Sequence, residues 1–285
     1  MNLLRPRGLA TLLINIAWLA PSHAGVRETA DINRILRSVS DGRCEEAIQY
    51  LAERLQSKQP ELQLLAGSMY DQGSCVERNW EKATQLYQQA ALGGMGDDAL
   101  PRLVSIYAVG YRDPAAALWW AAQRPAMLPK DCLPAADPTK QASAFLDELR
   151  GWPESRLKGC TYYAGVLFRL KYRSSVRLIR RGASDEVPVN IKIDAANGLI
   201  EWYSVIDMKT VVSHLPPDSR EIDMSTAPSE DEDPFLRYLW ATGVIVLKEF
   251  GAPPAQIPSW DTKNTIHIAR AIYSPNMLEF ITVSP

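Results

Sequence analysis

The chain lacks the sequence motifs by which hydrolases and nucleotide-dependent enzymes are recognised. It has no G-x-S-x-G turn, no H-E-x-x-H pair and no glycine-rich phosphate loop. Histidine is scarce: beyond residue 24 only His214 and His267 remain, and neither lies in a known motif. Thiol catalysis needs a base beside the cysteine, and the carboxylates are too numerous to single out a glycosidase pair. We therefore expect no catalytic residue, no cofactor and no metal site.

The chain also has no excess of positive charge. Its 31 Lys and Arg against 33 Asp and Glu give a net charge of −2, whereas a nucleic-acid partner normally needs a basic face. An acidic run at residues 229–233 lacks the alternating ligands and the glycine of a calcium loop. We interpret it as the acidic start of a helix at Pro234, because carboxylates favour helix N-termini. Apolar residues make up 46% of the chain, which is enough for hydrophobic cores.

Long hydrophobic runs are missing as well, and the main apolar run lies near the N-terminus. Arg5 and Arg7 precede an apolar run at residues 8–20, and Ser22-His23-Ala24 follows as a small-x-small cleavage site. The run of about 13 residues is shorter than the roughly 20 that a membrane-spanning helix needs. This predicts a signal peptide, residues 1–24, cleaved after Ala24. Loss of the two arginines changes the net charge from −2 to −4 and leaves an exported chain without a transmembrane segment.

Cysteine is rare, and all four cysteines lie beyond the predicted signal peptide. They are Cys44, Cys75, Cys132 and Cys160. An even number in an exported chain favours disulfides. The absence of a C-x-x-C pair and of neighbouring histidines argues against zinc. Three connectivities are open, and free buried thiols are the alternative.

Residues 65–94 have the pattern of a helix pair. A first helix pattern ends near Tyr70, a glycine-centred turn follows, and a second helix pattern with small residues ends at a glycine pair. Ala83 follows Ala47 by 36 residues, and Tyr107 follows Tyr70 by 37, a period within the range of helical repeats. One such pair cannot bury its apolar side alone, so we expect pairs to stack on one another.

These residues resemble the SEL-one-like repeat, a relative of the tetratricopeptide repeat. The resemblance covers about a third of the chain, is closest at residues 65–94, extends to 99–123 and is weak before residue 57. It implies a right-handed stack of helix pairs that contacts proteins, often as an adaptor and often in the bacterial periplasm. The matching residues are Leu65, Gly67, Tyr70, Gly73, Val76, Lys82, Ala83, Tyr87, Ala90, Ala91 and Gly94.

The resemblance also bears on the disulfides, because exported members of this family commonly tie their helices together with them. Under that alignment Cys44 opens one second helix and Cys75 lies in the turn before the next, so both lie near one edge of the stack. We favour Cys44–Cys75 together with Cys132–Cys160, without excluding the other pairings.

The aromatic side chains of this region allow two interpretations. Trp80, Tyr87, Trp119 and Trp120 either belong to the core, the more common case at helical spacing, or line a groove for a partner. Because Trp119 and Trp120 are adjacent, they point about 100° apart on a helix, and we expect one of them to be partly exposed. Our candidate partner-binding residues are Trp119, Trp120 and Tyr107.

Beyond residue 159 the pattern changes to that of strands. Residues 162–170 are rich in strand formers, and residues 187–193 alternate between apolar and polar. Asn197-Gly198 then predicts a hairpin turn, with residues 199–206 as the returning strand. Pro188 has no N–H to donate, so we expect the first strand to lie at an edge there.

Residues 172–205 are similar to the start of a TonB-type C-terminal domain. In that alignment residues 235–250 are its long helix and 266–272 or 278–283 its closing strand. An insertion at 207–234 and the lack of a membrane anchor and of a Pro-rich spacer argue against energy transduction. The resemblance implies a small α+β domain that contacts partners through a strand edge. The matching residues are Tyr172, Gly182, Val187, Val189, Ile191, Ile193, Gly198, Ile200 and Val205.

The sequence thus predicts two domains after the signal peptide. Residues 30–150 form a short α-solenoid with a proline-rich connector at 125–138 and a capping helix at 139–150; residues 158–285 form an α+β domain with an antiparallel sheet. The function that we predict is that of a non-catalytic periplasmic adaptor for a protein partner in the cell envelope. The alternatives are an envelope hydrolase with its active site in the second domain, and a TonB-like docking module for outer-membrane partners.

Overall fold

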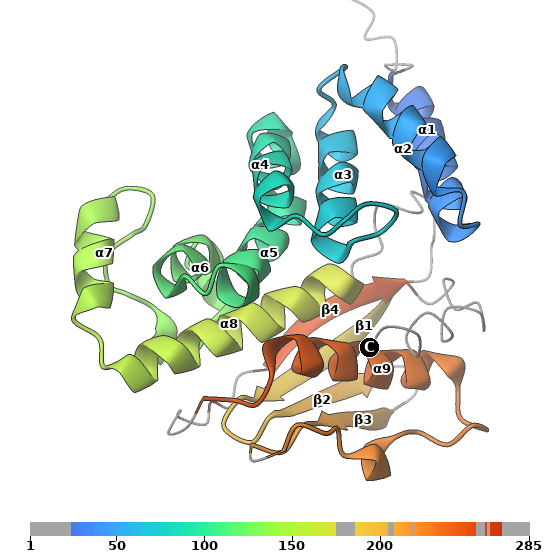
Figure 1. Cartoon of the computed structure of the whole chain (residues 1–285). Coiled ribbons are helices and arrows are strands. Elements are labelled where there is room, and N and C mark those ends of the chain that lie inside the picture. Colours follow the sequence, from blue (N-terminus) through green and yellow to red (C-terminus); the bar gives the residue numbers. More distant parts are fainter. Residues whose placement is uncertain are drawn as a thin grey trace, which may run out of the picture.

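The computed structural model describes residues 24–174, 186–204, 208–217, 219–254, 260 and 263–269. Within these ranges the chain is mostly helical and carries one small antiparallel sheet (Figure 1). The predicted signal peptide lies outside them, apart from Ala24, at which α1 begins. The helices are α1 (Ala24–Ser40), α2 (Cys44–Leu55), α3 (Pro60–Gln72), α4 (Trp80–Ala90), α5 (Gly96–Ser105), α6 (Pro114–Ala121), α7 (Ala142–Arg150), α8 (Glu154–Ser174) and α9 (Pro234–Phe250).

Helices α3 and α4 are the helix pair that the sequence predicts at residues 65–94. Gly73 ends α3 with a left-handed φ of 73°, and Asn79 caps α4 by accepting a hydrogen bond from the Lys82 N–H at 2.9 Å. The two helices approach closely at Gly67, where an added Cβ would lie 2.5 Å from Cε1 of Tyr87. A small residue at this position is therefore what lets the buried Tyr87 ring pack against α3.

Further helices lie on either side of this pair. In front of it, Ile35 of α1 and Leu51 of α2 share one buried core. Behind it, Pro114 opens α6, with Asp113 as its N-cap. Gly110 lies against the Trp80 ring, 2.7 Å from where its Cβ would be. The helix predicted at 139–150 is α7, and the connector before it forms only short 3₁₀ turns.

Both favoured disulfides are present. Cys44–Cys75 joins the start of α2 to the loop before α4, with the Cα atoms 4.9 Å apart. Cys132–Cys160 joins the connector to α8, with the Cα atoms 5.3 Å apart. The prediction of two disulfides is confirmed, and with it the pairing that the helical-repeat alignment favours.

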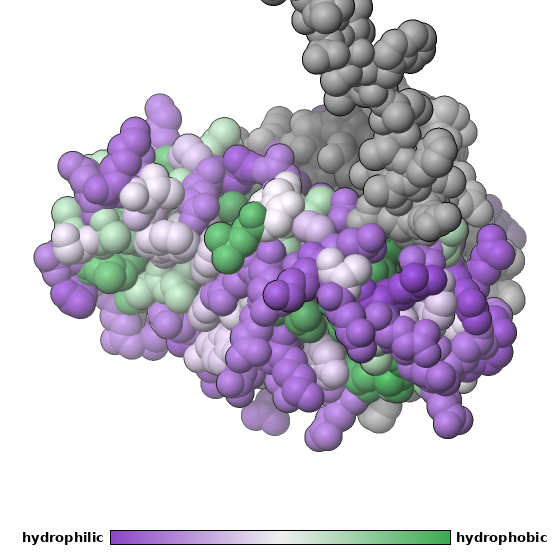
Figure 2. Space-filling view, turned by 90° about the horizontal axis from the view of Figure 1, so that it is seen from above, coloured by the Kyte–Doolittle hydropathy of each residue, from purple (hydrophilic) through white to green (hydrophobic). Residues whose placement is uncertain are grey.

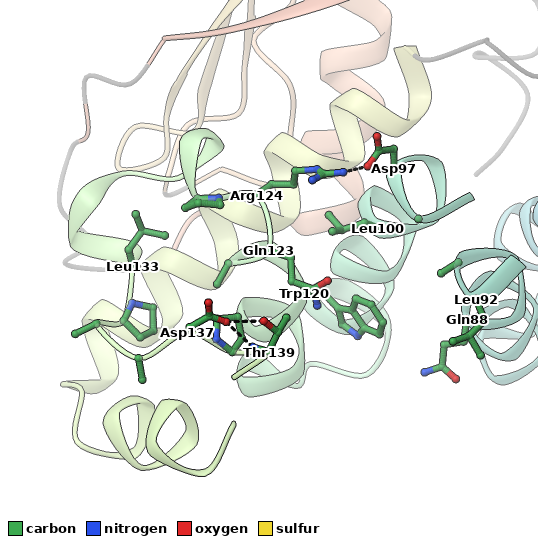
Figure 3. Close-up of a pocket in the computed structure, with 18 residues that line it drawn as sticks. Gln88, Leu92, Asp97, Leu100, Trp120, Gln123, Arg124, Leu133, Asp137 and Thr139 are labelled. Carbon is green, nitrogen blue, oxygen red and sulfur yellow. Dashed lines mark hydrogen bonds and ion pairs between the residues drawn. The ribbon is translucent and has the colours of Figure 1, made fainter. Parts of the chain in front are cut away.

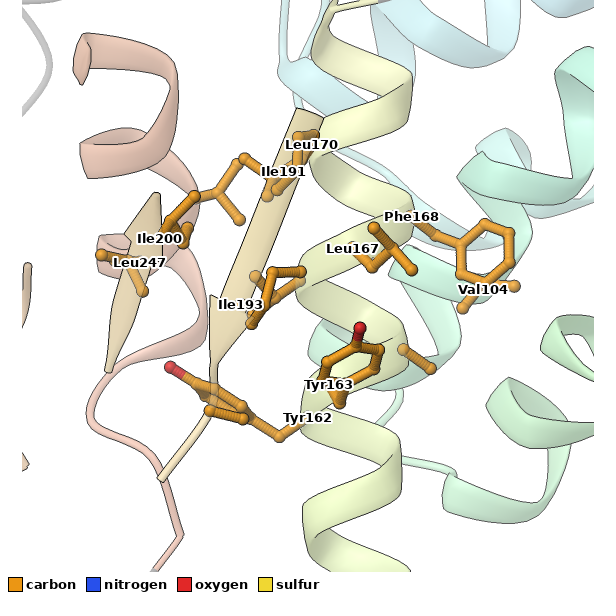
Figure 4. Packing of buried hydrophobic residues seen from close by; sticks show 14 of the residues in the cluster. Val104, Tyr162, Tyr163, Leu167, Phe168, Leu170, Ile191, Ile193, Ile200 and Leu247 are labelled. Atoms are coloured by element: carbon orange, nitrogen blue, oxygen red, sulfur yellow. The ribbon is translucent and has the colours of Figure 1, made fainter. Parts of the chain in front are cut away.

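The strand character of residues 162–170 is a wrong prediction, because they form the middle of α8. All nine are buried. One side of α8 packs on α5 and α6 and the other on α9 and β4, so an apolar residue is favoured on every face (Figure 4). Phe168 points towards Val104 of α5, while Leu170 lies beside Ile191 of β1. A run that is apolar all round does not distinguish a buried strand from a buried helix.

The sheet contains β1 (Glu186–Asp194), β2 (Leu199–Ser204), β3 (Lys209–His214) and β4 (Lys263–Ala269) in the order β3-β2-β1-β4. The predicted hairpin is confirmed as β1 and β2. Pro188 does not mark an edge strand: β1 lies inside the sheet, and Pro188 is opposite His267 of β4. The supposed insertion at 207–234 contributes β3, which pairs with β2. The closing strand at 266–272 corresponds to β4, whereas 278–283 lies outside the described residues.

Helices α8 and α9 cover the apolar face of the sheet. Helix α9 is the long helix predicted at 235–250, and Asp233, from the predicted acidic start, caps it by accepting from the Phe235 N–H at 2.8 Å. The largest hydrophobic core runs without interruption from Leu118 of α6 through Leu167 of α8 to Trp202 of β2. Helix α8 therefore belongs to the core of both predicted domains.

Candidate partner-binding groove

A groove of about 850 Å³ lies beside α6. Its walls come from the end of α4, the start of α5, the end of α6 and the connector at residues 125–139 (Figure 3). The Trp120 ring lies between the connector side, marked by Thr139, and the α4 side, marked by Leu92 and Gln88. We refer to this site as the Trp120 groove.

The two adjacent tryptophans have different roles. Their rings meet edge to face at 4.7 Å, and both are half-buried. The indole N–H of Trp119 donates to the Pro138 carbonyl at 3.1 Å, which holds the connector wall against α6. The indole N–H of Trp120 has no hydrogen-bond partner among the described residues. Trp119 therefore supports the wall of the groove, whereas Trp120 faces the groove with an indole N–H that is available to an occupant.

The third candidate, Tyr107, does not line the groove. It lies behind Gln88, whose side-chain amide donates to the Tyr107 hydroxyl at 3.4 Å. Partial burial, and then the neighbouring Tyr111 and Asp113, raise the pKa of Tyr107 above its ordinary value. Its position makes it a support for a lining residue.

The most exposed apolar residue of the groove, Leu92, is not among the residues predicted from the sequence. Leu92 is 90% exposed and lines the α4 side. Few large apolar side chains are exposed: among the described residues the others are Ile48, Tyr111, Met208 and Met224. The face shown in Figure 2 is correspondingly hydrophilic, with hydrophobic residues in small separate patches. Leu92 stands between small residues and a glycine pair, and nothing in that pattern distinguishes it from a core position.

The charged side chains of the Trp120 groove are engaged with one another or with the backbone. Arg124 and Asp97 form an ion pair across the rim (Figure 3). Asp137 accepts hydrogen bonds from the Thr139 hydroxyl at 2.6 Å and the Thr139 N–H at 2.8 Å, and from the Lys140 N–H. These bonds, the hydroxyl first, lower the pKa of Asp137. The groove therefore presents no free ion to an occupant.

The connector wall is fixed from behind. The Cys132–Cys160 bond ties it to α8, and Arg156 donates to the Asp131 carbonyl at 2.7 Å. On its other side the Glu148 carboxylate of α7 accepts from the N–H groups of Ala135, at 2.8 Å, and Ala136. A wall without regular secondary structure is thus held by a covalent bond and by hydrogen bonds from two helices.

A second polar cluster lies deep in the molecule, between α3, α8 and α9. Arg169, 3% exposed, donates to Asp71, 1% exposed, at 2.6 Å and to Glu249 at 2.8 Å. Burial alone would raise the pKa of Glu249, but the charges of Arg169 and Arg173 outweigh it and lower that pKa to about 2. Arg169 stays protonated, because the two carboxylates overcome the effect of its own burial and raise its pKa. Arg169 and Asp71 are buried, whereas Glu249 is partly exposed. We interpret the cluster as the tie between the three helices.

His214 and its polar neighbours do not have the arrangement of a nucleophilic catalytic triad. His214 Nδ1 lies 3.3 Å from Asp223 Oδ2, and Asp223 Oδ1 accepts from the Ser225 hydroxyl at 2.6 Å. The carboxylate thus stands between the hydroxyl and the imidazole, whereas nucleophilic catalysis needs the imidazole beside the hydroxyl. In the part of the chain that the structure describes, no three His, Cys, Asp or Glu side chains gather as metal ligands.

Comparison with known proteins gives no match: no family model, no curated protein and no solved structure is similar to this chain. Within the described ranges, no helix is both long and apolar enough to cross a membrane.

Proposed function

We propose that the protein is a non-catalytic, exported scaffold that holds a segment of a protein partner in the Trp120 groove. The observation that carries the proposal is Trp120 itself, which is half-buried in a groove with an unused indole N–H, next to an exposed Leu92. Tryptophan is enriched among the residues that dominate protein interfaces. Covering Leu92 would contribute about 2 kcal/mol to binding.

The framework supports the same proposal. Helices α1 to α6 follow one another as pairs that meet through small residues, such as Gly67 and Gly110, which is the construction expected of a SEL-one-like solenoid. Such stacks serve as platforms for other polypeptides. The Trp120 groove lies where the last of these pairs meets the connector.

The alternatives find less support among the described residues. The titratable groups of the groove, Asp97, Arg124 and Asp137, are held in an ion pair or a turn. In the Arg169 cluster, Arg169 and Asp71 are buried and paired with each other. An unpaired strand edge near Val187 would favour a TonB-like docking module, but Val187 pairs with Ile268 of β4. Neither a hydrolase nor a strand-edge docking module is therefore our preferred function.

We also propose the periplasm as the location of the mature protein. Two disulfides suit an oxidising compartment, and the N-terminal 24 residues have the pattern of a signal peptide. Both are consistent with a partner in the cell envelope.

Site-specific photo-crosslinking in cells tests the scaffold proposal. A photoreactive phenylalanine derivative replaces Leu92, and in a control protein it replaces Ile48 on α2, which is also exposed, at 39%. We expect a discrete crosslinked protein from position 92 and not from position 48. Trp120→Ala should abolish that product, while Trp152→Ala should leave it unchanged, because Trp152 packs under Arg156 at 3.7 Å outside the groove.

Thermal unfolding of each variant shows whether it is folded. The same products from both positions, or a product at position 92 that persists in a folded Trp120→Ala variant, would refute the proposed site.

A further inference from the structure

We infer that the occupant of the Trp120 groove is an extended, uncharged peptide segment that contains proline. The inference rests on the proposed function and specifies its partner. Three features of the groove support it: its charges, its unused donor and its walls.

The charges of the groove offer no unpaired counter-charge to an ionic occupant. Arg124 is paired with Asp97, and Asp137 accepts three hydrogen bonds at Oδ1 from the turn at Thr139 and Lys140 and pairs through Oδ2 with the Lys140 ammonium at 3.7 Å. A charged peptide would have to break one of these interactions or lose part of its own hydration without a counter-charge, and buried unpaired charge is costly. An uncharged segment neither breaks these interactions nor gives up the hydration of a charged group.

The unused donor that faces the groove is the Trp120 indole N–H, which has no hydrogen-bond partner among the described residues. The side-chain amide nitrogen of Gln123 also has none, but it is buried within the wall. An occupant that contacts Trp120 can therefore satisfy it with an acceptor. An extended chain offers its backbone carbonyls, and in polyproline II conformation these make no internal hydrogen bonds. Each proline also removes one N–H that would otherwise need an acceptor.

The walls favour a narrow, preformed segment. Leu92, Leu100 and Leu133 give apolar surface around the Trp120 ring, and aromatic-lined grooves are the sites at which proline-rich segments dock. The volume of about 850 Å³ lies within the range of small-ligand pockets, roughly 300–1,000 Å³. A few extended residues fit within this volume. A polyproline II segment loses little conformational entropy on binding.

Synthetic peptides test this inference with the purified, oxidised mature protein. The probe is acetyl-(Ala-Pro)5-amide. The controls are the flexible (Ala-Ser)5 peptide and the charged (Lys-Pro)5 and (Glu-Pro)5 peptides, which keep the proline spacing. Binding is followed by the indole N–H resonances of the seven tryptophans that remain after loss of Trp18 with the signal peptide, and that of Trp120 is assigned from the Trp120→Phe variant.

We expect the (Ala-Pro)5 peptide to shift the Trp120 resonance and to bind at least about ten-fold more tightly than any control peptide. Trp120→Phe keeps an aromatic ring and removes the N–H, so it should weaken binding about five-fold, the effect of one hydrogen bond. Trp152→Phe should have no effect.

Tighter binding of either charged peptide would overturn the inference, as would equal binding of the (Ala-Ser)5 peptide. Absence of binding by all four peptides up to about 5 mM, or an affinity unchanged in Trp120→Phe, would also overturn it. Crosslinking at position 92 separates the two proposals. A crosslinked partner without (Ala-Pro)5 binding refutes only the occupant, whereas loss of both refutes the scaffold as well.

Discussion

The N-terminal helix pairs and the C-terminal α+β region are held together in different ways. Helices α1 to α5 bury two small cores, one around Leu51 and Leu65 and the other around Tyr87 and Leu103, and each core is shared only by neighbouring helices. The C-terminal region has one large core, in which α8 joins helices on one side to a sheet on the other. The first region depends on close local approach, and the second on packing between distant parts of the chain.

The difference decides where a substitution should act. In the first region each core is shared by neighbouring helices, so damage there should weaken one interface. In the second region α8 packs on α5, α6, α9 and β4, so damage to α8 should affect the large core. The Arg169 cluster lies where the two regions meet, because it joins α3 to α8 and α9.

The largest effect should come from Arg169→Ala. It leaves the Asp71 carboxylate buried without its cation and removes one of the two cations of Glu249. Removing one partner of a buried ion pair typically destabilises a protein by about 3–5 kcal/mol. We expect a loss of this size in the free energy of unfolding, measured with guanidinium chloride at pH 7. Arg173→Ala, in a half-buried position, should have a smaller effect.

An acid titration provides an independent check on the same cluster. The pKa of Glu249 is lowered from 4.5 to about 2, so its contribution to stability is present above about pH 4.5 and is lost as the pH falls towards 2. The difference between wild type and Arg169→Ala should shrink over that interval. A difference that stays constant with pH would show that the ion pairs do not link the two regions.

The two disulfides should have similar effects on stability and different effects on binding. Their ends are 31 and 28 residues apart, and closure of such loops contributes about 3 kcal/mol. We expect each double Cys→Ala variant to lose about that much in guanidinium unfolding. Only Cys132→Ala/Cys160→Ala frees the connector wall, so only this variant should lose most of its affinity for the (Ala-Pro)5 peptide.

Cys44→Ala/Cys75→Ala is the matched control, because that bond ties α2 to the loop before α4 and none of the residues lining the groove belongs to either. Equal loss of peptide binding in both variants would mean that the groove depends on general stability and not on its tethered wall.

The same contrast between local contacts and packing of distant segments explains which parts of the structure could be predicted from the sequence. Local signals identified the α3–α4 pair from its glycines, the β1–β2 hairpin from its alternation, and α9 from its acidic start. Each of these depends on residues close together in the sequence.

What the sequence did not reveal depends on distant packing. Residues 162–170 form a helix because α5, α6 and α9 surround them, and Pro188 lies inside the sheet because β4 returns from more than 70 residues away. The Trp120 groove combines α4, α5, α6 and a connector without a sequence pattern of its own. Trp120 could be proposed from its position beside Trp119, but Leu92 and the Arg124–Asp97 pair could not.

The smallest of these effects, and the most direct test of the helix pairs, is expected for Gly67→Ala. The new Cβ would lie 2.5 Å from Cε1 of the buried Tyr87 ring, so α3 and α4 would have to separate. Overpacking of this kind destabilises by about 1–3 kcal/mol, partly offset by the better helix propensity of alanine, about 1 kcal/mol. We expect a net loss of up to about 2 kcal/mol in chemical unfolding. Gly96→Ala is the control, because its φ is −56° and no atom lies within 4 Å of its added Cβ, so stability should change by less than about 0.5 kcal/mol. If the two variants were equally stable, close approach at glycine would not be what holds these helices together.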